Sequence, residues 1–212
     1  FLGLDGLEPT LVDRYLAEGK LPNLAALGER GRYSRLRTTF PPLSPVAWST
    51  FATGSNPGKH QMFDFLNRRL KSYVPELASS RVEPPRRHFK IGRRIFPLGR
   101  PIVEQRRKSK TFWSLLGERR IDSTILRVPI TFPPEKFEGK MLSAMCTPDL
   151  LGTQGSFQEF TTASGEADFE AGFRRPLRAG GGVYRGEILG PENSAVEGGG
   201  TLRIPFTLKL DG

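Results

Sequence analysis

The amino-acid sequence predicts an α/β protein with a doubly wound, mostly parallel sheet. Apolar runs that suit strands alternate with helical patterns through much of the first 150 residues, the order expected of βαβ units. A carboxylate and a glycine end the first apolar run, as is common where ligand-binding loops leave parallel strands. After residue 150 the chain changes to short candidate strands separated by glycines. We therefore expect an α/β core over 1–150 and a β-rich inserted subdomain over 151–212.

The first elements follow this alternation in order. An apolar strand over 1–5 precedes a helical pattern over 9–18, which Gly19 ends. A second helix is predicted over 22–30, and the alternating residues 33–38 suit a strand. The order strand, helix, helix, strand favours a layered α/β core.

The next predicted element is a helix over 44–53 with Ser44 as its N-cap. Pro45 suits the first helical position, and Gly54 suits the C-terminal stop. The N-terminus of a helix carries a partial positive charge that favours anions. The hydroxyl of Ser44 is therefore either a simple cap or part of a phosphate site.

Asp5 stands at the end of the first predicted strand, where it could share a crevice with Ser44. A carboxylate beside a hydroxyl suits a divalent metal, which would lower the hydroxyl pKa and make it a nucleophile. The alternative is that Asp5 only caps the first helix or its turn. A dinucleotide-binding turn is disfavoured because the local sequence is not G-x-G-x-x-G and contains an acid.

The later elements continue the same pattern. A helix is predicted over 111–117, with strands over 123–128 and 140–146. A further strand over 201–210 contains Pro205, which indicates a sheet edge or a bulge.

The positive charge is concentrated in one segment. Residues 81–110 hold eleven Lys or Arg and two Glu, so they carry +9 of the net +10. We expect an irregular basic insertion with apolar anchors, able to contact an anionic substrate, a membrane surface or nucleic acid. The alternative is a solvated insertion without a partner.

Composition sets further limits. The sequence has no run of apolar residues long enough to span a membrane, and its single cysteine excludes an internal disulfide. Two histidines cannot supply a His-rich metal site. The chain begins and ends inside apparent elements, so we expect a fragment. A cytoplasmic location is weakly favoured, and the sequence does not indicate an oligomeric state.

Several ordered motifs together resemble the alkaline phosphatase superfamily, in particular its type I phosphodiesterase/nucleotide pyrophosphatase branch and the related phosphohydrolases and phosphomutases. The resemblance covers about residues 1–160. It implies an incomplete sheet of the alkaline phosphatase type. The motifs that carry it are Gly3-Leu4-Asp5-Gly6, Gly19-Lys20-Leu21-Pro22-Asn23-Leu24, Pro41-Pro42-Leu43-Ser44-Pro45-Val46-Ala47-Trp48, Thr53-Gly54-Ser55-Asn56-Pro57-Gly58-Lys59-His60, Trp113 within 111–116, Val128-Pro129-Ile130-Thr131-Phe132-Pro133-Pro134 and Cys146-Thr147-Pro148-Asp149.

The resemblance implies a metal-dependent phosphoric ester hydrolase acting on a small phosphorylated substrate. Ser44 would be the nucleophile that forms a covalent phosphoseryl intermediate, and Asp5 and Ser44 would both bind one of two divalent ions, Zn or Mn. Lys59 and His60 are candidates for contact with the substrate phosphate, although a lone His after a turn is more often an orienting or surface residue. A phosphomutase or phosphotransferase of the same superfamily, or a non-catalytic anion-binding module, is the alternative.

Some residues depart from the family pattern. Thr39 precedes Phe-Pro, as a nucleophilic Thr does in some nucleotide pyrophosphatases, but the spacing back from Thr53 favours Ser44. Phe65 replaces a phosphate-binding Asn, and Gln61 replaces a Gly, so a nucleotide preference is not supported.

The family's other metal ligands are a D-x-x-x-H arrangement, an Asp-His pair and a last His in its carboxyl-terminal half. The sequence has no Asp-His pair. We therefore expect the remaining ligands beyond residue 212 and expect this fragment alone to be inactive.

Overall fold

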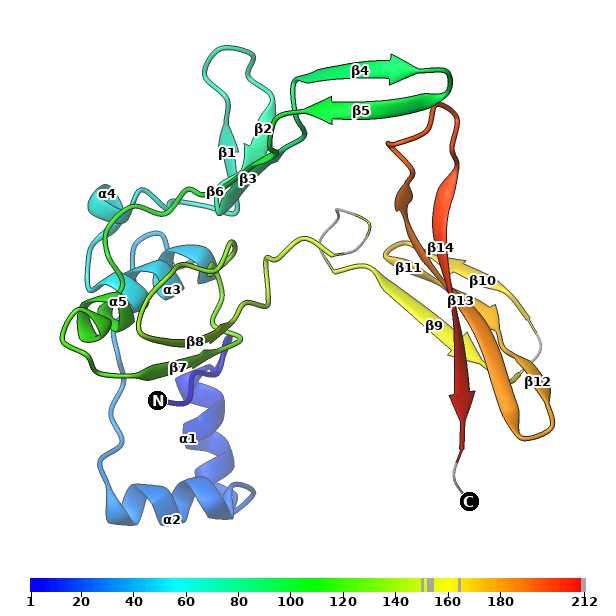
Figure 1. Cartoon of the computed structure of the whole chain (residues 1–212). Helices are drawn as coiled ribbons and strands as arrows, with labels where there is room; N and C mark the ends of the chain where they lie inside the picture. The colour runs from blue at the N-terminus through cyan, green and yellow to red at the C-terminus, as the bar shows by residue number, and fades with distance from the viewer. Residues whose placement is uncertain (150, 152–154, 164, 211–212) are drawn as a thin grey trace. The chain divides into compact units, whose positions relative to one another are not determined.

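A computed structural model describes residues 1–149, 151, 155–163 and 165–210 (Figure 1). The chain divides into two compact units. The first unit comprises Phe1–Ser79, Arg106–Ile130 and Pro134–Leu142, and the second comprises Ser80–Gln105, Thr131–Pro133 and Ser143–Gly212. The predicted boundary between 1–150 and 151–212 falls at residue 150, which lies outside the described residues.

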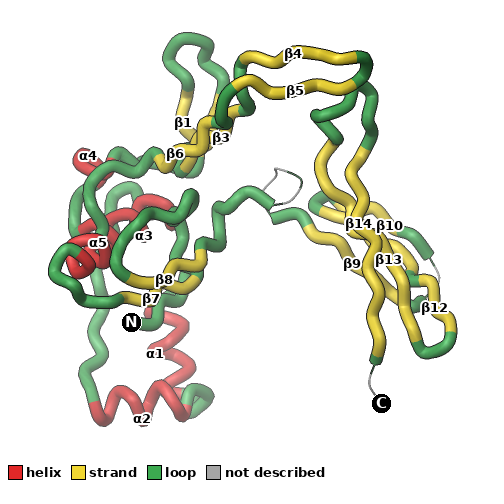
Figure 2. The backbone as a smooth tube through the Cα atoms, viewed as in Figure 1, coloured by secondary structure: helices red, strands yellow, loops and turns green. Residues whose placement is uncertain are grey.

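The first unit contains the helices of the described chain, drawn in red in Figure 2. Several begin with a proline in the first turn, where the absent N–H costs no hydrogen bond. Their bounds are α1 Pro9–Ala17, α2 Pro22–Arg30, α3 Ser44–Thr53, α4 Pro57–His60 and α5 Phe112–Gly117. The helices predicted from the sequence are thus confirmed within one or two residues.

The strands of the first unit form two small sheets. β1 (Leu66–Arg68) pairs antiparallel with β2 (Pro75–Leu77), and β7 (Ser123–Leu126) pairs in parallel with β8 (Gly139–Leu142). The last pair confirms the strands predicted over 123–128 and 140–146, although both end early. Both pairs belong to the same unit as the helices.

The core of the first unit joins α3, α5 and β7. Ala52, Trp113 and Ile125 are buried together, and Phe112 and Met141 pack against them. Burying such apolar side chains stabilises the fold by roughly 1.5–3 kcal/mol for each large one. The core therefore anchors α3 through Ala52, near the end of the helix that lies opposite its N-terminus.

Residues 1–5 and 33–38 do not form the strands that the sequence predicts, so this prediction is wrong. Neither segment forms a strand ladder with any described residue. Phe1, Leu2 and Leu36 are largely exposed, as expected for extended segments without a neighbouring strand. Arg35 instead forms an ion pair with Asp13 of α1.

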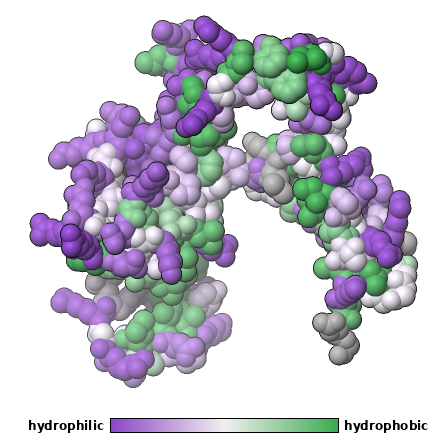
Figure 3. Space-filling model, viewed as in Figure 1, coloured by the Kyte–Doolittle hydropathy of each residue, from purple (hydrophilic) through white to green (hydrophobic). Residues whose placement is uncertain are grey.

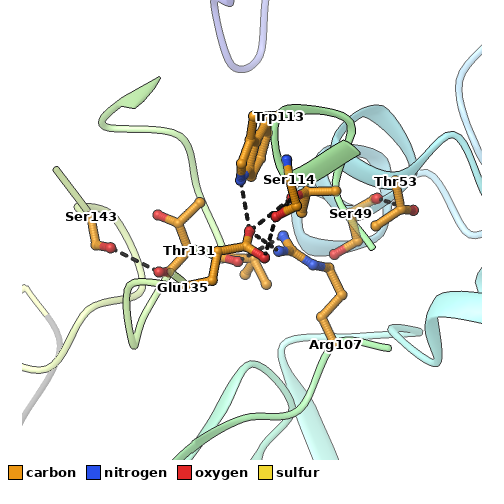
Figure 4. Close-up of polar contacts among 10 residues, drawn as sticks. Ser49, Thr53, Arg107, Trp113, Ser114, Thr131, Glu135 and Ser143 are labelled. Atoms are coloured by element: carbon orange, nitrogen blue, oxygen red, sulfur yellow. Dashed lines mark hydrogen bonds and ion pairs between the residues drawn. The ribbon is translucent and has the colours of Figure 1, made fainter. Parts of the chain in front are cut away.

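A buried polar network supports α5. Glu135 accepts hydrogen bonds from Trp113 Nε1 at 2.7 Å, Thr111 Oγ1 at 3.0 Å and Ser114 Oγ at 3.1 Å, and Arg107 Nη2 lies 3.3 Å from the same carboxylate. Figure 4 shows Glu135 beside Trp113, Ser114 and Arg107. The Arg107 side chain is 1% exposed. Burial lowers the pKa of the Arg107 guanidinium, and the charge of Glu135 opposes this shift.

The second unit contains two three-stranded sheets formed by residues beyond 155. Gln158 links them, because its side chain accepts a hydrogen bond of 2.8 Å from the Leu189 N–H. The first sheet has the order β10-β11-β9, with β9 and β11 parallel, and the second has the order β12-β13-β14. The bounds are β9 Phe157–Thr161, β10 Ala167–Phe169, β11 Gly172–Pro176, β12 Arg178–Gly180, β13 Val183–Glu192 and β14 Thr201–Lys209. The strand predicted over 201–210 is confirmed as an edge strand.

The basic segment is more regular than the irregular insertion predicted from the sequence. It forms nested antiparallel pairs: β3 with β6, and β4 with β5 between them. Gly92, with φ 57°, begins the two-residue turn between β4 and β5, where a glycine relieves backbone strain. The prediction missed this hairpin because four prolines interrupt the apolar pattern. The bounds are β3 Ser80–Glu83, β4 Arg87–Ile91, β5 Arg94–Leu98 and β6 Ile102–Gln105.

The described chain is therefore a mixed α/β protein with small sheets of parallel and antiparallel strands. The mostly parallel, doubly wound sheet predicted from the sequence is not formed within it, because the segments 1–5 and 33–38 pair with no other strand. None of the helices in the described ranges has the length and apolar character needed to cross a bilayer.

Candidate active site at the start of α3

α3 holds the strongest candidate residue at its first turn. Leu43 is the N-cap and is extended, so Ser44 is the first helical residue and not the cap that the sequence predicts. No side chain caps this end. Pro45 and Val46 are buried, which fixes the turn against the core. The Ser44 hydroxyl is therefore available for contacts outside the helix.

The Ser44 hydroxyl contacts Asp5. Its Oγ lies 3.1 Å from Asp5 Oδ1 and 3.2 Å from Oδ2, so the hydroxyl donates to the carboxylate. These residues are 39 positions apart in sequence. The structure brings together the two residues that the sequence predicts to share a metal site.

Trp48, to which the sequence assigned no role, is part of the same site. Its Nε1 donates to Asp5 Oδ1 at 3.2 Å. Trp48 lies four residues after Ser44 on α3, so both side chains occupy one helix face. The four-residue spacing from Ser44 was the feature of the sequence that could have indicated a role for Trp48.

Gly3 allows the N-terminal segment to approach Trp48. A Cβ built on Gly3 would lie 2.3 Å from Cη2 of the Trp48 ring, closer than any real contact. A side chain at this position would have to displace the ring or the segment that carries Asp5. The glycine thus contributes to the position of the carboxylate.

The electrostatic setting of Ser44 favours an anion. The partial positive charge of the α3 N-terminus lies next to its hydroxyl. The N–H groups of Val46 and Ala47 both donate to the Leu43 carbonyl, at 3.0 and 2.9 Å. The helix would therefore act on a phosphoryl group mainly through its dipole and not through these two N–H groups.

Asp5 and Ser44 fit part of a divalent metal site. Both offer oxygen donors, and both carboxylate oxygens face the hydroxyl. Within residues 1–149, 151, 155–163 and 165–210, no group of three or more His, Cys, Asp or Glu side chains is placed to hold a metal. Among the described residues, Asp5 and Ser44 thus could supply two of the ligands of one ion.

His60 is buried and engaged within the chain. The Met62 N–H donates to Nδ1 at 3.1 Å, so the ring proton is on Nε2, which lies 2.9 Å from Thr50 Oγ1. Burial, and then the charge of Arg107, lower the pKa of His60. Lys59 is exposed beside it. Their contacts with a substrate stay predictions.

Two neighbouring positions clarify the departures from the family pattern. Gln61 ends α4 with φ 60° and ψ 27°, the left-handed conformation that favours the glycine found there in the family pattern. The Thr39 hydroxyl donates to the Pro41 carbonyl at 3.0 Å. Thr39 therefore contacts the main chain, whereas Ser44 contacts a carboxylate.

A serine hydroxyl at a helix N-terminus beside a carboxylate is the kind of site that phosphoester-cleaving enzymes use for nucleophilic attack. The family model described as type I phosphodiesterase / nucleotide pyrophosphatase matches residues 1–159 of the 212, and the chain belongs to this family. The family is one of phosphoester hydrolases that are generally metal-dependent. No curated protein and no solved structure matches the chain.

Proposed function

We propose that the protein is a metal-dependent phosphodiesterase or phosphatase that acts through a phosphoseryl intermediate on Ser44. The observation that carries this proposal is the hydrogen bond between Ser44 and Asp5 at the start of α3. Membership of the phosphodiesterase family supports the reaction class. The proposal includes an alkaline-phosphatase-type sheet and further metal ligands beyond residue 212.

Two residues of this chain would hold a metal, namely Asp5 and Ser44. A bound Zn or Mn ion, one of a proposed pair, would lower the hydroxyl pKa and offset charge on the phosphoryl oxygens. The Trp48 hydrogen bond would keep Asp5 turned toward the helix.

The proposed reaction has two steps. Ser44 Oγ forms a bond to phosphorus while the bond from phosphorus to the ester oxygen breaks; the hydroxyl of Ser44 releases its proton to solvent, and the leaving oxygen takes one from solvent. Water then cleaves the phosphoseryl ester and restores the hydroxyl. The dipole of α3 favours the negative phosphoryl group in both steps.

Trapping the intermediate tests this proposal. The full-length protein with Zn or Mn is expected to hydrolyse an aryl phosphodiester or monoester, and acid quenching during turnover should leave phosphate on Ser44. Mass spectrometry of the peptides locates the modification. Phosphate on Thr39, or turnover without any phosphoprotein, would contradict the assignment. Transfer of the phosphoryl group to a second alcohol in preference to water would identify a phosphomutase or phosphotransferase.

A second candidate function is suggested by the β4–β5 hairpin. Phe89 and Phe96 stack across it with ring centroids 5.0 Å apart, and both are partly exposed. In register, Arg87 and Arg94 lie on the same face at its two ends. Figure 3 shows hydrophobic side chains gathered over β4 and β5. We propose that this face binds an anionic membrane surface.

Vesicle sedimentation tests whether the β4–β5 hairpin binds an anionic membrane surface. The full-length protein is expected to bind phosphatidylserine vesicles but not neutral ones, and to dissociate as salt rises. The double variant Arg87→Gln/Arg94→Gln should weaken binding severalfold, whereas Arg119→Gln/Arg120→Gln, which removes two charges at exposed positions outside the hairpin, should have little effect. Equal binding to neutral vesicles, or binding to nucleic acid alone, would refute this role.

A further inference from the structure

The second unit contains an open cavity of about 630 Å³ beside the β12-β13-β14 sheet. Residues of both three-stranded sheets line it, and the two sheets pack through Phe160 and Phe206, whose ring centroids lie 4.9 Å apart. Its charged lining consists of four arginines and two glutamates, namely Arg175, Arg178, Arg185, Arg203, Glu166 and Glu187.

Two of these arginines are direct cross-strand neighbours. In the register of β12 and β13, Arg178 pairs with Arg185, and in the register of β13 and β14, Arg185 pairs with Thr207. Directly paired residues point to the same face of a sheet, so two guanidinium groups and one hydroxyl form a row along the cavity. Like charges at such positions destabilise a sheet unless something compensates them.

No acidic residue in the described chain forms an ion pair with Arg178 or Arg185. Glu187 is bound to Arg203, with 3.3 Å between Oε2 and Nη1. Arg175 is likewise paired, at 3.0 Å, with Asp168. Among the described residues the two exposed guanidinium groups of the row thus have no carboxylate partner, and a bound anion would offset their repulsion.

We propose that Arg178, Arg185 and Thr207 bind the phosphoryl group of inorganic phosphate or of a phosphate monoester. The planar guanidinium fork matches the oxygens of phosphate, and such charge-assisted hydrogen bonds are stronger than neutral ones. Thr207 adds a hydroxyl donor. Pro205 and Leu189 line the same cavity, and strand alternation places them on the face of Arg185 and Thr207, where they would contact an organic group attached to the phosphate.

Titration calorimetry of the full-length protein in EDTA tests this site, because the chelator suppresses metal-dependent phosphate binding at Ser44. Inorganic phosphate is expected to bind, and Arg178→Gln or Arg185→Gln should weaken binding about tenfold or more. Arg100→Gln, at an exposed position of the same unit, is the matched control and should bind as the unmodified protein does. Absent binding in the unmodified protein, or equal losses in all three variants, would overturn the proposal.

Phenyl phosphate distinguishes the two sources of the phosphoryl group. Tighter binding of phenyl phosphate than of inorganic phosphate would identify a phosphate monoester as the ligand, and equal binding would identify inorganic phosphate.

Thermal unfolding gives an independent measurement. Without ligand, Arg178→Gln should leave the Tm unchanged or raise it, because it removes a like-charge contact. Phosphate should raise the Tm of the unmodified protein and of Arg100→Gln but not that of Arg178→Gln. A ligand-free Arg178→Gln protein with a clearly lower Tm would mean that the chain already compensates this arginine, and the site would be rejected.

Discussion

Ser44→Ala is expected to lower kcat for phosphoester hydrolysis by a factor on the order of 10⁴ to 10⁶, as loss of a covalent nucleophile does in other enzymes. The reason is that the variant cannot form the phosphoseryl ester. Its stability should change by only about 0.5 kcal/mol, because Ser44 is not a helix cap and its hydroxyl bonds only to the exposed Asp5. Steady-state kinetics and urea unfolding measure the two effects.

Thr39→Ala is the matched control for this result. Thr39 also carries a hydroxyl near the start of α3, but it donates to the Pro41 carbonyl. We expect Thr39→Ala to keep most of the activity and to form the phosphoseryl peptide. The nucleophile would have to be reassigned if Thr39→Ala were inactive while Ser44→Ala turned over normally.

Glu135→Ala is expected to lower the free energy of unfolding by about 3–5 kcal/mol, since it leaves the buried charge of Arg107 without its carboxylate. Trp113, Thr111 and Ser114 would lose the same hydrogen-bond acceptor. Urea unfolding followed by tryptophan fluorescence measures the loss.

Two further variants separate the buried ion pair from the other contacts of Glu135. Glu118→Gln removes a surface pair with Lys110, whose side chains are 53% and 66% exposed, and should cost about 0–1 kcal/mol. The double variant Arg107→Met/Glu135→Leu should cost less than the sum of the single changes, because no buried charge is left alone. Additive losses would show that Arg107 and Glu135 do not depend on each other.

The sequence predicted the helices well because their limits are set locally. Pro22 and Gly54 mark a start and a stop through backbone geometry alone, and the structure places helix ends at both. Strands need a partner, which no local pattern specifies. The segments 1–5 and 33–38 have strand-like sequences but no neighbouring strand in the described chain, so this part of the prediction was wrong.

The sequence predicted only part of the candidate site and its surroundings. Asp5 and Ser44 were paired because one ends a predicted strand and the other opens a helix, and the family resemblance supported this; the structure places their side chains in hydrogen-bond contact, although residues 1–5 form no strand. Their catalytic and metal-binding roles stay predictions. Glu135 and Arg107 were missed because a buried ion pair between distant residues leaves no pattern in the sequence.

The contact between Gly3 and the indole ring of Trp48 has a consequence for the alignment of the first segment. Sliding that segment by one residue in either direction would place the Cβ of Leu2 or Leu4 against the ring. Of these three alignments, only the observed one puts a residue without a side chain there, and it also brings the residue two positions later opposite the serine. The close packing of Gly3 against Trp48 thus fixes the register of the first segment. This steric fit, which takes no part in the reaction, places Asp5 opposite Ser44.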